Sequence, residues 1–235
     1  MESIQTPITV MKRYEWKYIL SAAQTDAFVA RLEGHMEPDA YGLTTIASLY
    51  YDTPDYRLIR ESIEKPEFKE KIRLRAYGRA TDRTPVYLEL KRKAYGIVYK
   101  RRVQATVPEA EQFFSGTLNL DENGQIDREI TYFRDYYHTL VPACMILYDR
   151  TAYCEPDGDL RLTIDRNPRY RVDAFRFDSD PVGKPLLHAG DTILELKVQD
   201  VIPLWLVQIL SDLNIKRGSI SKYGEAFRRE HLLAI

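Results

Sequence analysis

Basic and apolar residues alternate along several short segments of this chain. In residues 71–76, with the sequence KIRLRA, every second side chain is basic and those between them are apolar. Successive side chains of a β-strand point to opposite faces, so this pattern predicts a strand with one basic and one apolar face. The same period of two recurs in residues 13–18, 87–91, 161–165 and 194–198. If these strands share one antiparallel sheet, one of its faces is densely charged and the other is apolar.

The charged strand faces are strongly basic, although the whole chain is nearly neutral. With 34 Lys and Arg against 35 Asp and Glu, the formal charge is −1, which argues against a general nucleic-acid-binding protein. Ten basic residues fall on the predicted charged faces: Arg13, Lys17, Lys71, Arg73, Arg75, Lys91, Lys100, Arg102, Arg161 and Lys197. Only four acidic residues accompany them: Glu15, Glu89, Asp165 and Glu195. This segregation predicts a binding site for a long anion that carries many charges.

The remaining patterns predict an α+β protein. Apolar residues at helical spacing and capping signals predict helices at about 22–33, 126–140, 203–213 and 221–232, and a short helix after Pro108. Further strands are expected at 46–52, 86–93, 99–107, 144–153, 160–166 and 192–198. Helices must bury their apolar stripes, so we expect them outside the sheet, on its apolar face. The sheet can then close into an antiparallel β-barrel around a charged tunnel. We see no linker or domain boundary and expect one domain, residues 1–235.

The sequence also carries signals about the compartment. Cys144 and Cys154 are the only cysteines, which favours ordinary thiols in a reducing compartment. We recognise no secretory signal, transit peptide or apolar run of membrane-spanning length. The expectation is a cytoplasmic protein, with any membrane association made through a partner protein that this sequence does not reveal.

An ordered set of motifs along nearly the whole chain resembles the VTC-type polyphosphate polymerase domain, a branch of the triphosphate tunnel metalloenzymes. The motifs are RYEWKY (13–18), SLYYDT (48–53), KIRLRAYG (71–78), ELKRK (89–93), KRR (100–102), YDRTAY (148–153), RLTID (161–165), ELK (195–197) and SKY (221–223). Each motif alone is weak, whereas the ordered set is specific. The resemblance implies an antiparallel tunnel that holds triphosphate or polyphosphate with a divalent metal. Members of this branch extend polyphosphate from ATP.

The resemblance also implies roles for individual residues. Phosphate contacts are implied for Lys17, Arg73, Arg75, Lys91, Lys100, Arg150 and Lys222, of which Arg73, Arg75, Lys91 and Lys222 are the candidates for catalysis. The strand pattern adds Lys71, Arg102, Arg161 and Lys197 as candidates for phosphate binding. Glu195 is the implied carboxylate for Mn²⁺ or Mg²⁺, with Glu89 and Asp165 as further candidates. Arg13 stands where the other tunnel-enzyme branch has its first glutamate, which weakens an adenylate-cyclase or thiamine-triphosphatase interpretation.

Three functions stay open on the sequence. The first is a metal-dependent polyphosphate polymerase, whose partners would be ATP and inorganic polyphosphate, with no nucleic acid expected. The second is a hydrolase of the same fold that cleaves triphosphate or polyphosphate. The third is a non-catalytic module that binds polyphosphate or another polyanion. The binding residues are common to all three, and the implied metal-binding Glu195 argues against the third.

Overall fold

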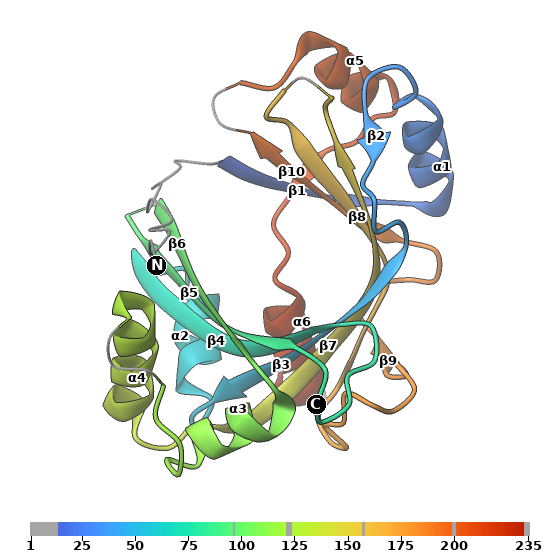
Figure 1. Ribbon diagram of the computed structural model, residues 1–235. Helices are drawn as coiled ribbons and strands as arrows, with labels where there is room; N and C mark the ends of the chain where they lie inside the picture. Colours follow the sequence, from blue (N-terminus) through green and yellow to red (C-terminus); the bar gives the residue numbers. More distant parts are fainter. Residues whose placement is uncertain (1–13, 96, 121–123, 157, 199–200, 233–235) are drawn as a thin grey trace, which may run out of the picture.

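The computed structural model describes residues 14–95, 97–120, 124–156, 158–198 and 201–232. It has the α+β architecture expected from the sequence: an antiparallel sheet curves strongly around a central space, with most of the helices on its convex side (Figure 1). The predicted position of Arg13 on the basic face lies outside the described residues.

Eleven strands form the sheet, and every pairing between them is antiparallel. They are β1 (Tyr14–Leu20), β2 (Glu37–Pro38), β3 (Thr44–Asp52), β4 (Phe68–Tyr77), β5 (Val86–Ala94), β6 (Ile97–Ala105), β7 (Val141–Cys154), β8 (Arg161–Arg171), β9 (Lys184–Pro185), β10 (Thr192–Val198) and β11 (Arg217–Gly218). Their order is β11-β1-β10-β8-β7-β3-β4-β5-β6, with β2 beside β7 and β9 beside β8. Within the described residues no backbone ladder joins β6 to β1 or β11, so the sheet forms a tunnel-like curve without closing.

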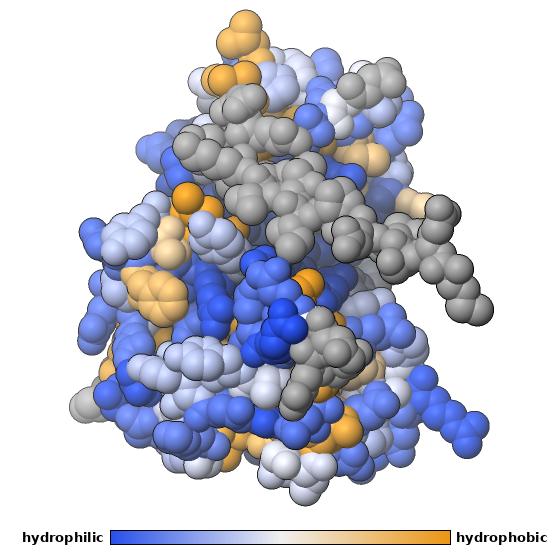
Figure 2. Space-filling view, turned by 60° about the vertical axis from the view of Figure 1, so that its left-hand side comes forward, coloured by the Kyte–Doolittle hydropathy of each residue, from blue (hydrophilic) through white to orange (hydrophobic). Residues whose placement is uncertain are grey.

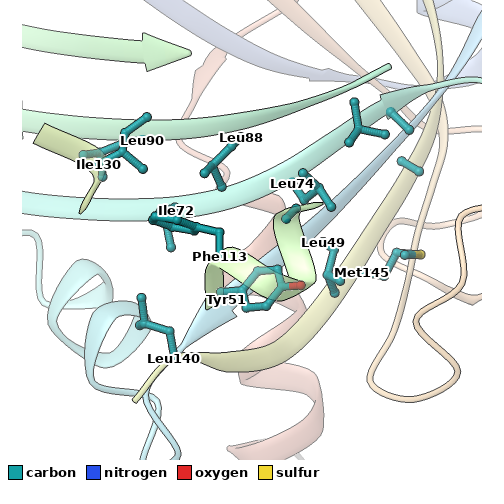
Figure 3. Packing of buried hydrophobic residues seen from close by; sticks show 14 of the residues in the cluster. Leu49, Tyr51, Ile72, Leu74, Leu88, Leu90, Phe113, Ile130, Leu140 and Met145 are labelled. Atoms are coloured by element: carbon teal, nitrogen blue, oxygen red, sulfur yellow. The ribbon is translucent and has the colours of Figure 1, made fainter. Parts of the chain in front are cut away.

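Two helices cover the apolar face of β3, β4 and β5. Figure 3 shows Ile72 of β4 near Phe113 of α3 (Val107–Phe114), and Leu90 of β5 near Ile130 of α4 (Gln125–Tyr137). These four side chains are fully buried. Each buried apolar side chain of this size stabilises the fold by roughly 1.5–3 kcal/mol. This packing fixes the alternation predicted from the sequence, because it holds the other face of the strands toward the central space.

A second pair of helices covers the apolar face of β1, β8 and β10. α1 (Ala22–Ala30) begins at Ser21 with the capping box predicted from the sequence, in which Ser21 and Gln24 bond reciprocally. Its Phe28 and the Leu206 of α5 (Leu204–Asp212) pack with Leu194 and other strand residues. Of the helices described, none has the length and apolar character needed to cross a membrane.

The last helix differs from the expectation that helices pack outside the sheet. α6 (Lys222–His231) lies against the concave face, where its Tyr223 and Phe227 pack with Ile46 and Ile146 (Figure 1). It also contacts α2 (Arg57–Ile63), which begins after the β3 strand. The inner face is apolar at this position and requires a cover. As a result, the first turn of α6 brings Lys222 to the charged part of the central space.

Candidate functional site

A row of three lysines crosses the inner face of β4, β5 and β6. In the strand register, Lys71 lies opposite Lys91, and Lys91 lies opposite Lys100. Like charges directly opposite each other destabilise a sheet, so this row is unfavourable for the fold by itself. Figure 2, in which the left-hand side of Figure 1 comes forward, shows mainly hydrophilic residues on the outer surface beside β6, with some hydrophobic residues among them.

One buried carboxylate organises the neighbouring cations. Glu89 is 1% exposed, and its Oε1 lies 2.8 Å from Lys100 Nζ and 2.8 Å from Arg102 Nε. Its Oε2 lies 2.7 Å from Arg73 Nη2 and 3.6 Å from Arg75 Nε. Burial alone would raise the pKa of Glu89, but Arg73 and Arg75 hold it well below its usual range. A single negative charge therefore faces four cations, which leaves an excess of positive charge.

A second cluster contains the two other buried carboxylates of the inner face. Asp165 accepts hydrogen bonds from Arg150 at 2.6 and 2.9 Å and lies 2.5 Å from Lys222 Nζ. Arg150 also donates to Glu195 at 3.3 Å, and Lys197 Nζ lies 3.8 Å from Glu195 Oε1. Burial alone would raise the pKa of both carboxyl groups, but their cationic neighbours lower both values. Both groups are therefore ionised at neutral pH.

Two lysines from opposite sides of the sheet share one glutamate. Glu15 of β1 lies 3.1 Å from Lys17 Nζ and 3.5 Å from Lys91 Nζ of β5. Lys17 also lies opposite Glu195 in the strand register. Burial would lower the pKa of Lys17, but Glu195 and Glu15 raise it to about 12. The Glu15–Lys91 ion pair thus links β1 to β5 across the part of the sheet that no described backbone ladder closes.

Lys71 differs from the inner lysines that form ion pairs, namely Lys17, Lys91, Lys100, Lys197 and Lys222. Its Nζ donates to Ser221 Oγ at 3.0 Å, and in the described part of the chain no carboxylate forms an ion pair with it. Burial within the tunnel walls lowers the pKa of Lys71 to about 7, and the neighbouring Lys69, Lys91, Lys17 and Arg73 contribute to this shift. An anion bound beside Lys71 would supply the missing negative charge.

Three buried polar groups of the inner face also have no hydrogen-bond partner in the described residues: Ser48 Oγ, Thr163 Oγ1 and Arg75 Nε. Ser48 lies opposite Arg75 between β3 and β4, and Thr163 lies opposite Glu195 between β8 and β10. An unsatisfied buried polar group costs roughly 1–3 kcal/mol, so such groups commonly mark a position for water or a ligand. Their places beside the two charged clusters fit a ligand rich in oxygen atoms.

Aromatic residues that the sequence analysis gave no role complete the walls. Tyr148 of β7 lies within 3.4 Å of Arg75, and its ring lies 4.5 Å from Lys222 Nζ. Burial would raise the pKa of Tyr148, but Arg75 and Arg150 lower it. Tyr50 of β3 accepts a hydrogen bond from Arg73 at 2.9 Å. The only sequence signal for a functional role of Tyr50 and Tyr148 was their place inside the motifs SLYYDT and YDRTAY. An aromatic residue in a strand is otherwise more often part of the core.

One predicted residue, Arg161, lies at the periphery. Arg161 lies opposite Lys197 in the register of β8 and β10, on the face that carries Asp165. Unlike Lys197, Arg161 is exposed, and it makes no ion pair among the described residues. The structure therefore brings Arg161 to the same surface but not into either carboxylate cluster.

The carboxylates fit a divalent metal only if a ligand completes its coordination. No group of three or more His, Cys, Asp or Glu side chains able to hold a metal occurs within the described ranges. Asp165 and Glu195 lie near each other, because one nitrogen of Arg150 bonds to both. Mg²⁺ commonly takes one or two carboxylates, several waters and substrate phosphate oxygens. These residues thus suit a metal that arrives with, or is retained by, a phosphate ligand.

Comparisons with known proteins agree with this geometry. The family model described as VTC domain matches residues 12–231. A putative adenylate cyclase from Bacillus halodurans is similar in structure, with a TM-score of 0.57, 13% identity, and coverage of 90% of this chain and 96% of that one. A putative adenylyl cyclase from Hippeastrum, described as revealing a dominant triphosphatase activity, has a TM-score of 0.55 at 18% identity, with 94% and 97% covered. At these identities the likeness shows the fold alone. No curated protein sequence matches the chain.

Proposed function

The chain belongs to the VTC domain family, and from this we propose that it is a metal-dependent polyphosphate polymerase, which transfers the γ-phosphate of ATP to a growing polyphosphate chain. Family and fold together support an enzyme of phosphoryl transfer or hydrolysis that acts on triphosphate or polyphosphate. The observation that carries the proposal is the convergence of basic side chains from seven strands and α6 on one concave surface, in excess of its four carboxylates. We assign the activity to residues 1–235 as one domain.

Phosphate binding in this proposal falls to the inner cations. Arg73 and Arg75 stand two residues apart on β4, and each guanidinium can bind phosphate oxygens in a bidentate manner. With Lys91 and Lys222 they contact the phosphates that react. The remaining inner cations hold the rest of the substrate: Lys17, Lys71, Lys100, Arg102, Arg150, Arg161 and Lys197. Binding supplies the negative charge that the empty surface lacks.

Glu195, with Asp165 beside it, would hold Mn²⁺ or Mg²⁺ together with phosphate oxygens. The ion would neutralise and orient the phosphates of ATP. Glu89 was also a candidate ligand, but it forms ion pairs with four cations, whereas Glu195 forms ion pairs with two among the described residues. We therefore assign Glu89 to orienting these cations.

The reaction needs position and charge more than acid–base chemistry. A terminal oxygen of the polyphosphate chain attacks the γ-phosphorus of ATP, the new P–O bond forms, and the bond to the β-phosphate oxygen breaks. ADP leaves with that oxygen. The attacking oxygen is already ionised, so no strong general base is required, and the basic residues stabilise the charge that spreads over the transferred group. We place this reaction in the cytoplasm, where ATP is supplied, with membrane contact only through a partner protein.

The test is incubation of the purified protein with ATP and Mn²⁺, with chain growth and phosphate release measured separately. Chain growth that Arg75→Ala abolishes and Arg83→Ala leaves unchanged supports the polymerase, because Arg83 is an exposed residue outside the concave surface. Phosphate release without chains would replace the polymerase by a hydrolase. Neither reaction, with salt-sensitive binding of polyphosphate, would replace it by a binding module.

A further inference from the structure

Two more lysines extend the basic row toward the open end of the β4–β5 hairpin, away from its turn. Lys69 lies opposite Lys93, and these residues stand two positions beyond Lys71 and Lys91 in the same register. Since side chains alternate along a strand, all four lysines belong to the inner face. Neither lysine is among the sequence candidates, since residue 69 precedes the alternating segment 71–76 and residue 93 follows the alternating segment 87–91.

No described carboxylate neutralises the added pair. The Nζ of Lys69 donates only to the backbone oxygen of Ser62, at 3.3 Å, and in the described residues neither Lys69 nor Lys93 takes part in an ion pair. Burial lowers the pKa of Lys69, and Lys93, Lys65 and Lys91 add to this effect. Two cations that face each other across a ladder destabilise the sheet. Local features that oppose the fold in this way are expected at functional positions.

We infer that Lys69 and Lys93 form an additional subsite, which binds the segment of a polyphosphate chain that extends beyond the catalytic part of the tunnel. This inference rests on the proposed function. When a polyphosphate chain is too long for the centre of the tunnel, its extending part would contact the open end of the β4–β5 hairpin.

The spacing of the lysines suits a linear polyanion. Neighbouring strands lie about 4.8 Å apart, and two residues advance about 6.6 Å along a strand. The pairs Lys71–Lys91 and Lys69–Lys93 therefore follow one another along the two strands at regular spacing. Lys93 is exposed and Lys69 is half-buried, which places the Lys69–Lys93 pair at the boundary with solvent. The lysines face the same side as Lys71 rather than the convex surface, and this favours an anion that continues from the tunnel over a flat lipid surface.

The test compares short and long substrates on matched variants. The double variant Lys69→Gln/Lys93→Gln is measured against Lys184→Gln/Lys216→Gln, which removes two exposed lysines from other elements. Binding of tripolyphosphate and of long-chain polyphosphate is titrated at several salt concentrations. For the first variant we expect about tenfold weaker binding of the long chain, a log–log salt dependence shallower by about 1.4, and tripolyphosphate affinity within about twofold of the unchanged protein. The control should bind both as before.

The possible failures are distinguishable. Unchanged long-chain affinity in a variant that still binds tripolyphosphate would overturn the subsite and leave the proposed function standing. Equal weakening for both anions would also overturn it, because the lysines would then act through the general charge of the tunnel. Loss of binding to phosphatidylserine vesicles, with polyphosphate binding unchanged, would assign the lysines to a membrane instead. An unchanged protein that binds neither phosphate anion would overturn the proposed function and the subsite together.

Discussion

At the scale of single residues, charge balance decides what the site can do. Glu89 is buried among four cations, whereas Lys71 lies among cations with no carboxylate partner in the described residues. The alternating sequence pattern correctly predicted that both residues face the interior. The pattern could not show which of the two residues has partners of opposite charge, because these partners come from other strands. Arg102, for example, reaches Glu89 from the neighbouring strand, 13 residues along the chain.

Glu89→Gln should destabilise the empty protein, because four cations lose their shared negative charge. Removing one partner of a buried ion pair lowers the free energy of unfolding by about 3 kcal/mol or more. Tripolyphosphate should then stabilise this variant more than it stabilises the unchanged protein, since it replaces the lost charge. Thermal unfolding with and without tripolyphosphate measures both effects.

The matched control for this experiment is Glu70→Gln. Glu70 is also buried, and it accepts hydrogen bonds from Arg92 at 2.7 Å and Tyr137 at 3.0 Å, on the opposite face of β4. It should lose stability without gaining an extra response to tripolyphosphate. An equal response in both variants would show that the Glu89 cluster does not face the anion.

Lys71→Arg should change how anion binding depends on pH. Above the pKa of about 7, Lys71 is increasingly neutral in the empty tunnel and must take up a proton when a polyanion binds. Affinity of the unchanged protein should therefore fall as the pH rises from about 7 to about 9, by at most tenfold per unit from this one group. Burial also lowers the pKa of Lys100, to about 8, so part of the dependence stays in the variant.

Titration of tripolyphosphate binding across this pH range checks the prediction. Arginine keeps its charge throughout, so the curve of Lys71→Arg should be flatter than that of the unchanged protein. Curves of identical slope would mean that Lys71 stays protonated in the empty tunnel or lies outside the bound anion.

At the scale of secondary-structure elements, the placement of α6 depends on a buried carboxylate far away in sequence. Asp52, at the end of β3, accepts hydrogen bonds from Leu58 and Ile59 in the first turn of α2 and from the hydroxyl of Tyr223, at 2.8 Å. One side chain thus ties the starts of two helices together. The sequence predicted both the strand and the helix. It did not predict their contact, because apolar residues on an otherwise charged strand face gave no sign that a helix covers them from inside.

Tyr223→Phe should lower turnover about tenfold, because the preceding residue, Lys222, loses the anchor that holds it beside Asp165. Stability should fall by about 1 kcal/mol, as for a single buried hydrogen bond. Tyr170→Phe is the matched control, since its hydroxyl donates to Glu230 at 2.7 Å and neither residue belongs to the concave charged clusters. It should lose similar stability and keep its turnover. Equal turnover in the two variants would show that Tyr223 does not position Lys222.

At the scale of the whole molecule, the described part of the sheet has two edges where the sequence suggested a closed barrel. The period-two pattern specifies which side chains face inward, and this prediction is confirmed for the charged clusters. Closure depends on strand tilt, stagger and the very short strands, and none of these leaves a pattern in the sequence. The short strands β2, β9 and β11, of two residues each, were missed for the same reason.

Tripolyphosphate should slow amide hydrogen exchange in β6, the edge strand that carries Lys100 and Arg102. An anion held by these residues and by Lys17 of β1 would join the two edges and suppress local opening, by about tenfold in exchange rate. Amides of α1, on the convex side, serve as the internal control and should not change. Slowing confined to α1, or absent from β6, would contradict a ligand that spans the central space.

The ion pair between Glu15 and Lys91 has a mechanical consequence. Exposed or half-exposed ion pairs contribute only about 0–1 kcal/mol, and parting this one breaks no backbone hydrogen bond. Separating β1 from β5 at this position would therefore break this one ion pair, while the helices stay packed on both halves of the sheet. We therefore expect the distance between β1 and β5 to differ between the empty and the anion-bound protein.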